Sequence, residues 1–308
     1  YGGMTRNPWD PTEGSSGSSA GSASATAAGL VPFAIGTETW GSIVSPSTRC
    51  GTTGLRPTFG LVSRAGAMAL SWSMDKIGPI CREVDDCAIV FDAIRGSDGI
   101  DRTVRDVQFV YDQDIDPASI RIGYIKSAFD EEYDWKETDA RTLDVLRELG
   151  FELVPVELPD YPVYSMAFVL NAEAAAAFDE LTRSNRDDQM VRQIRNAWPN
   201  VFRAARFIPA VEYIKANRIR YMLMQEMDKF PVDVWVSPSF VGKNLLLTNL
   251  TGHPCVVLPN GFSDEGKPVS ITFNGRLFEE GLLLAVAGKY QESTDFHKKH
   301  PPAFQGSD

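Results

Sequence analysis

Hydrophobic and polar positions along the chain predict strands and helices that follow one another. Apolar residues recur at helical spacing over residues 84–94. Farther along, the apolar runs at residues 121–124 and 151–156 flank a helical pattern over residues 138–149, which Gly150 ends. This strand–helix–strand order favours an α/β fold.

The same pattern predicts the elements of the second half of the chain. Two polar helices are expected within residues 164–228, with Pro199 and Pro209 near their breaks. The strands and the last helix expected after them cover residues 232–236, 255–258, 269–273 and 279–290. No internal repeat and no sharp linker is visible, so we expect one domain over residues 1–308.

Residues 12–29 consist mainly of Gly, Ser, Ala and Thr. Such a composition is typical of a flexible linker. However, residues 20–29 are rich in alanine and suit a closely packed helix, and residues 30–36 form a short apolar run typical of a buried strand. We therefore predict that this segment belongs to the core.

Composition narrows the class of protein. The 308 residues are 43% hydrophobic and carry a net charge of −11, which argues against direct nucleic-acid binding and against adhesion to an anionic membrane. No apolar run is long enough for a membrane-spanning helix. The presence of only three histidines argues against a His-rich metal site.

The cysteines indicate a reducing compartment. Cys50, Cys81, Cys87 and Cys255 form no C-x-x-C pair, and their scatter suggests buried, reduced thiols. We therefore predict a cytoplasmic protein. The chain opens Tyr1-Gly2-Gly3 without an initiator Met, inside what reads as a loop, and shows no signal-peptide pattern, so we expect it to be incomplete at its N-terminus.

Two glycine- and serine-rich segments between residues 14 and 58 could carry chemistry. Residues 17–22 (GSSAGS) place hydroxyl groups beside very small residues, so the backbone can approach a ligand closely. Residues 36–43 (GTETWGSI) put Ser42 after a glycine at the start of an expected helix, where N–H groups could hold a developing oxyanion. The Walker pattern of phosphate-binding loops is absent, and the dinucleotide-binding fingerprint is not found between a strand and a helix, as it requires. The G-x-S-x-G motif of other serine hydrolases does not occur around Ser42.

Three blocks in this region resemble the signature of the amidase signature family. That family shows G-G-S-S-G-G-S-A, then G-[TS]-D-x-G-G-S-I, then C-G-x-x-G-[LF]-[KR]-P-T. The corresponding segments here are residues 17–23 (GSSAGSA), 36–43 (GTETWGSI) and 50–58 (CGTTGLRPT). Ser18 and Ser42 lie 24 residues apart, the spacing of the family's two catalytic serines. Weaker similarity continues at DKIGP, TGHP and PNGF and so covers nearly the whole chain.

The resemblance implies an amidase signature fold, with a mixed β-sheet core covered by α-helices and a signature core over residues 14–58. It also implies hydrolysis of carboxamide C–N bonds by a Ser–cis-Ser–Lys mechanism, without metal or cofactor. Ser42 would be the nucleophile of an acyl-enzyme, and Ser18 would be the bridging serine after a cis peptide from Gly17. The oxyanion hole implied consists of the backbone N–H groups of Thr39, Trp40, Gly41 and Ser42.

This sequence departs from the family pattern at several positions. No lysine precedes Ser18, where the family has its catalytic base; either an N-terminal segment is missing or the polypeptide is inactive alone. Lys76 is the nearest lysine downstream, but its block holds no catalytic base in the family, so we do not assign it that role. Trp40 replaces a glycine beside the nucleophile and is expected to restrict the pocket, and Glu38 replaces an aspartate.

Other residues of these blocks are expected to be structural. Gly17, Ser19 and Thr37 are interpreted as support for the catalytic groups, as is Ser22. Cys50 is expected to be a small buried residue and His253 a structural loop residue. Arg56 and Arg49 either neutralise buried carboxylates or are solvated.

Three functions remain open from the sequence. The leading one is an amidase that acts on a small-molecule linear amide. The second is the glutaminase subunit of a tRNA-dependent amidotransferase, in which partner subunits supply the tRNA contacts; the sequence also allows a homo-oligomer. The third is a truncated, non-catalytic scaffold that lacks the lysine base.

Overall fold

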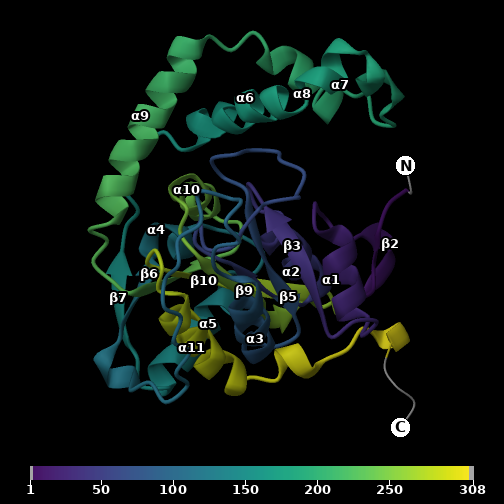
Figure 1. The fold of residues 1–308 in the computed structure, drawn as a ribbon. Coiled ribbons are helices and arrows are strands. Elements are labelled where there is room, and N and C mark those ends of the chain that lie inside the picture. Colours follow the sequence, from purple (N-terminus) through teal and green to yellow (C-terminus); the bar gives the residue numbers. More distant parts are fainter. Residues whose placement is uncertain (1–2, 305–308) are drawn as a thin grey trace.

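The computed structural model describes residues 3–304, and one mixed sheet runs through the middle of this part of the chain (Figure 1). Within these residues the sheet has eight strands in the order β3-β5-β4-β9-β10-β8-β6-β7. β6 pairs parallel with β7 and β8, and the other neighbours are antiparallel. The strands are β3 (Phe33–Glu38), β5 (Lys76–Cys81), β4 (Thr53–Arg56), β9 (Cys255–Phe262), β10 (Pro268–Gly275), β8 (Val234–Pro238), β6 (Arg121–Ile125) and β7 (Glu152–Val156).

One face of the sheet is covered by α3 (Val84–Ile94), α5 (Lys136–Glu148) and α11 (Glu280–Glu292). Their apolar side chains, among them Phe91 and Leu283, join those of the strands in the largest hydrophobic cluster. All three helices lie where the apolar periodicity predicts them. The prediction of an α/β fold with a mixed sheet is therefore confirmed.

The opposite face carries the glycine- and serine-rich region. α1 (Ala20–Ala27), α2 (Val44–Cys50) and α10 (Asn244–Thr251) lie there. Ala23 and Ala27 are fully or almost fully buried and pack against Ile43 and Ile80. The prediction that this segment belongs to the core rather than to a linker is confirmed, because alanine methyl groups let α1 approach the sheet closely.

Two local predictions near the N-terminus are wrong. The strand expected to be buried over residues 30–36 is β3, and it lies at the edge of the sheet, where it pairs only with β5. Phe33 and Ile35 are consequently 45% and 41% exposed. The segment interpreted as a loop contains the short hairpin of β1 (Arg6–Asn7) and β2 (Asp10–Gly14).

A group of four helices, which we call the helical arm (residues 168–227), arches over the sheet domain (Figure 1). The prediction of two helices here is wrong, because Pro199 lies in the first turn of α8 and Pro209 precedes α9, so each proline begins a helix. α9 joins the body where Leu223 packs in one cluster with Leu247 of α10. The arm helices are α6 (Phe168–Ala177), α7 (Asp179–Arg183), α8 (Trp198–Ala205) and α9 (Ala210–Met227).

Smaller elements complete the described chain. α4 (Lys126–Asp130) follows β6 directly. The 3-10 turns are Pro117–Ser119, Tyr164–Ala167, Arg186–Gln189, Phe296–Lys298 and Pro302–Phe304. All four cysteines are buried and unpaired, as predicted. Residues 3–304 contain no helix with both the length and the apolar character that crossing a membrane requires.

Candidate active site

The fold brings the first two sequence blocks into contact. The Ser19 N–H donates to the Ser42 carbonyl oxygen at 3.2 Å. The Ser19 hydroxyl donates to the Thr37 carbonyl oxygen at 3.1 Å and accepts from the Thr37 N–H at 3.0 Å. The Gly17–Ser18 peptide bond is cis, as the resemblance implies. Ser19 and Thr37 thus support the segment that carries Ser18, and they hold it beside Ser42.

The two candidate catalytic hydroxyls are accessible but not bonded to each other. Ser18 is exposed and Ser42 is half-buried. Among residues 3–304, the hydrogen bonds include none between these two side chains. Ser18 lines a cavity of about 400 Å³ together with Thr37 and Thr39. The structure therefore places Ser18 at a cavity, and the backbone N–H of its neighbour Ser19 holds the Ser42 segment beside it.

A tight turn presents Ser42. Gly41 has a φ of +129°, which an L side chain rarely adopts. Within the described part of the chain, the N–H groups of residues 39–42 donate no hydrogen bond to another protein group. These unpaired donors lie between the end of β3 and the start of α2. They can therefore bind a negatively charged oxygen without first breaking a protein hydrogen bond.

The Glu38 carboxylate fixes the chain just after Ser42. One oxygen accepts from the N–H groups of Ile43 at 2.8 Å and Val44 at 3.0 Å. The other accepts from Arg56 at 2.7 Å and from Asn249 at 2.8 Å. Burial alone would raise the pKa of Glu38, but the Arg56 guanidinium and these hydrogen bonds outweigh it and lower the pKa. Glu38 is therefore an ionised anchor for the turn.

Arg56 of the third block neutralises this buried carboxylate. Both side chains are completely buried. A second guanidinium nitrogen donates to the Thr248 hydroxyl and to the His253 carbonyl oxygen, each at 2.9 Å. By contrast, Arg49 pairs with Glu13 at the surface. The sequence left the roles of both arginines open, and the structure assigns charge neutralisation in the core to Arg56.

The wall of the cavity is held by the DKIGP block. Asp75 accepts from the Thr39 hydroxyl at 2.5 Å and from the N–H groups of Leu70 and Ser71 at 2.8 and 2.9 Å. This aspartate connects the segment after β3 to the loop that forms the opposite wall. The loop is also held by Arg64, which pairs with Asp101 at 3.1 Å.

Lys76 is a buried residue that lines the same cavity. Its amine donates to the Met74 carbonyl oxygen. Burial and the nearby Arg56 charge hold the pKa of Lys76 well below its ordinary value. Among residues 3–304, no group of three His, Cys, Asp or Glu side chains is placed to hold a metal ion.

Three further residues have structural roles. The His253 ring nitrogen Nδ1 and the Thr251 hydroxyl are 2.7 Å apart, and burial together with the Arg56 charge lowers the pKa of His253 to about 3. Burial raises the pKa of Cys50 to about 12. Trp40 packs against the hydrophobic cluster that contains Met74. Much of its bulk therefore fills the core.

The helical arm supplies residues that no motif pointed to. Phe178, at the end of α6, lines the cavity that contains Ser18. Glu173 of α6 accepts from the hydroxyls of Ser71 at 2.5 Å and Ser73 at 2.7 Å, and from Tyr213 of α9 at 2.7 Å. A glutamate in an alanine-rich helix gives no sequence signal of this role, because its partners lie about 100 residues earlier and 40 residues later.

Comparisons with known proteins agree on one family. The sequence model of the family described as Amidase matches residues 1–284. The chain is 35% identical to a glutamyl-tRNA(Gln) amidotransferase subunit from Picosynechococcus sp., over 97% of this chain and 72% of that protein. The native peptide amidase of Stenotrophomonas maltophilia is similar in structure, with a TM-score of 0.84 and 30% identity over 99% of this chain and 70% of that one. The corresponding amidotransferase subunit from Thermotoga maritima gives 0.77 and 27%, over 94% and 69%.

Proposed function

This chain belongs to the amidase signature family and is an amidase, and from this premise we propose that Ser42 is its nucleophile and Ser18 its proton relay. The Ser42 hydroxyl oxygen attacks the carbonyl carbon of a linear amide, and its proton passes to Ser18. Collapse of the intermediate breaks the C–N bond, and Ser18 returns a proton to the leaving amine. Water then hydrolyses the acyl-enzyme to the carboxylic acid.

The unpaired N–H groups of Thr39, Trp40, Gly41 and Ser42 support this assignment most directly. They belong to the turn that carries Ser42 and that Glu38 anchors, so they can stabilise the oxyanion of both tetrahedral intermediates. Loss of one donor of this kind typically raises the barrier by about 2.7–4 kcal/mol. The Ser19–Ser42 backbone contact supports the pairing of Ser18 with Ser42.

The base in this proposal is a neutral lysine that accepts the Ser18 proton, as the resemblance implies. The family pattern assigns no base to the Lys76 block, but among residues 3–304 Lys76 is the lysine that lines the Ser18 cavity, and its lowered pKa favours the uncharged amine, so it is the one to test. Replacing Lys76 with Met tests its part. Turnover that survives in this variant assigns the base to another lysine, whereas its loss in a folded variant assigns it to Lys76.

Steady-state hydrolysis tests the proposal. Ammonia release from a panel of primary amides is measured for the wild-type chain and for the Ser42→Ala and Ser18→Ala variants, together with their melting temperatures. We expect turnover to disappear in Ser42→Ala and to fall by about 10²–10⁴-fold in Ser18→Ala, with nearly unchanged stability. Undiminished turnover in Ser42→Ala would refute the assignment. A wild-type chain that hydrolyses no amide would favour the non-catalytic scaffold.

One observation favours a second candidate, the glutaminase subunit of a tRNA-dependent amidotransferase. The amidotransferase subunit from Picosynechococcus sp. is 35% identical to this chain. If this chain has that function, glutamine is its substrate and partner subunits bind the tRNA. Ammonia release from glutamine that rises only with charged tRNA and a partner subunit would favour this candidate. The four buried free thiols support the proposal of a reducing, cytoplasmic location for either enzyme.

A further inference from the structure

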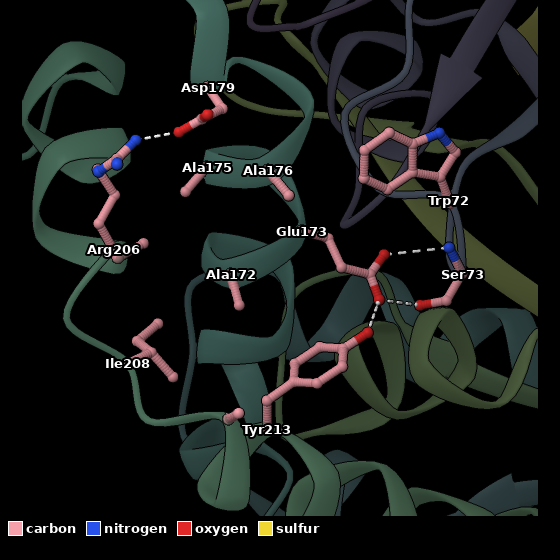
Figure 2. Close-up of a pocket in the computed structure, with 12 residues that line it drawn as sticks. Trp72, Ser73, Ala172, Glu173, Ala175, Ala176, Asp179, Arg206, Ile208 and Tyr213 are labelled. Carbon is pink, nitrogen blue, oxygen red and sulfur yellow. Dashed lines mark hydrogen bonds and ion pairs between the residues drawn. The ribbon is translucent and has the colours of Figure 1, made fainter. Parts of the chain in front are cut away.

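A second and larger cavity lies beneath the helical arm (Figure 2). Its volume is about 780 Å³, within the range of sites that enclose a small molecule. Small side chains leave this space open along one face of α6 and at the adjoining ends of α8 and α9. The alanines that line it are Ala172, Ala175, Ala176, Ala205 and Ala210.

The polar groups of this cavity are already paired. The Glu173 carboxylate, which Figure 2 shows beside Ser73 and Tyr213, accepts four hydrogen bonds, from Ser71, Tyr213 and two groups of Ser73. On the opposite side, Asp179 forms an ion pair with Arg206. A charged group on a ligand would therefore find no unpaired counter-charge among the described residues that line this cavity.

This cavity adjoins the one that contains Ser18. Trp72 lines both this cavity and the one that contains Ser18. Phe178 lines the Ser18 cavity, while its chain neighbour Asp179 lines the cavity under the arm. A substrate held in the Ser18 cavity would therefore reach the second cavity by passing Trp72.

We propose that the cavity under the helical arm binds an uncharged, apolar substituent of the substrate, which makes this enzyme selective for amides with a long alkyl or aryl group. This inference rests on the proposed function for the position of the reacting carbonyl. Methyl groups and aromatic rings line the space, so burying an apolar chain there is favourable. Glutamine carries a charged amino group and a charged carboxylate, and both would lose water without gaining a partner.

The test uses fluorophosphonate esters that share one reactive group and carry ethyl, hexyl or decyl tails. The rate of covalent labelling at Ser42 is measured by intact-mass spectrometry and peptide mapping. We expect the decyl probe to react at least roughly 10-fold faster than the ethyl probe in the wild-type chain. In Ala176→Phe, which fills the cavity from an exposed helical position, we expect the decyl advantage to disappear and the ethyl rate to stay within about 2-fold.

The matched control is Ala140→Phe, at an exposed position of α5 that lines neither cavity. It should leave all three rates unchanged. Equal wild-type rates for the three tails, or a decyl advantage that survives in Ala176→Phe, would overturn the substituent site while leaving Ser42 as the nucleophile.

Calorimetric binding of decanamide separates failure of the site from failure of the proposed function. Measured in Ser42→Ala, which does not hydrolyse the ligand, decanamide is expected to bind at least roughly 10-fold more tightly than acetamide, and adding Ala176→Phe should remove this difference. Such binding without any labelling at Ser42 would support the site and overturn the nucleophile. Decanamide that binds no more tightly than acetamide would overturn the site whatever the labelling shows.

Discussion

The Glu38–Arg56 ion pair connects the second sequence block to the third and anchors the turn after Ser42. We expect Glu38→Ala to lower the free energy of unfolding by about 3–5 kcal/mol, because it leaves Arg56 buried without a counter-charge. Glu13→Ala is the control, since Glu13 pairs with Arg49 and Lys267 at partly exposed positions. That change should cost less than about 1 kcal/mol. Urea denaturation of both variants measures these free energies of unfolding. Similar losses in the two variants would show that the buried ion pair stabilises no more than the surface one.

Titration of Asp139 is expected to make part of the free energy of unfolding depend on pH. Burial raises its pKa from 3.8 to about 6, although Asn260 donates a hydrogen bond to it. The folded protein therefore keeps this proton while the unfolded chain releases it. The contribution of the protonated Asp139 carboxyl to the free energy of unfolding is complete below 3.8, the pKa in the unfolded chain. It is lost as the pH rises to about 6, the pKa in the folded protein.

We therefore expect Asp139→Asn to gain stability relative to wild type, by on the order of 2–3 kcal/mol, between about pH 4 and pH 7. Denaturation at several pH values measures this difference. Asp144→Asn, at a mostly exposed position of the same helix, is the control and should track the wild type. A difference between Asp139→Asn and wild type that does not change with pH would exclude this titration.

Among the elements, the helical arm depends on Glu173. This carboxylate joins α6 to the loop at Ser71 and Ser73 and to α9 through Tyr213. Burial would raise the pKa of Glu173, but these hydrogen bonds lower it, so the group is ionised at neutral pH. The arm and the wall of the Ser18 cavity are consequently coupled at one side chain.

We expect Glu173→Ala to increase amide hydrogen exchange in the arm and in the loop over residues 70–75. The free energy of the opening that exposes these amides should fall by about 1–3 kcal/mol, because the donors of Ser73 and Tyr213 lose a charged acceptor. Glu180→Ala, which removes a largely exposed partner of Arg186, is the control. Unchanged exchange in Glu173→Ala would show that the arm is held elsewhere.

The helices that periodicity predicts best are those that pack one face against the sheet. The helix over residues 84–94 has the bounds expected, since its apolar stripe and acidic first turn are local signals. The prediction for β3 is wrong because an apolar run does not reveal whether a strand has one neighbour or two. The prediction for the arm is wrong because a proline that begins a helix and a proline that ends one look alike without the surrounding structure.

At the scale of the molecule, the signature blocks predicted the family and the mixed sheet, because close backbone contacts allow little variation in residue type. They did not predict the cavity under the arm. That cavity arises where alanines of three helices meet over Trp72, so it depends on tertiary packing. The anchoring role of Glu38 needed the structure too, since its partners Arg56 and Asn249 are distant in sequence.

The packing of the whole molecule is expected to make its thiols unreactive in the native state. All four cysteines are buried, and burial raises the pKa of Cys50 and of Cys255 to about 12. We expect a colourimetric thiol reagent to label none of them in the native protein within minutes, and all four in denaturant. A cysteine that reacts in the native state as fast as in denaturant would contradict the packing described.

Site-mapped labelling with a fluorophosphonate tests whether Ser42 is a nucleophile that Ser18 assists. We expect one adduct, at Ser42, that is absent in Ser42→Ala and forms at least about 10²-fold more slowly in Ser18→Ala. Ser24→Ala, which removes only a hydroxyl bonded to the Arg6 carbonyl oxygen, should label at the wild-type rate. An adduct at another residue would show that Ser42 is not the nucleophile, and labelling in Ser18→Ala as fast as in wild type would show that Ser18 is not its proton relay.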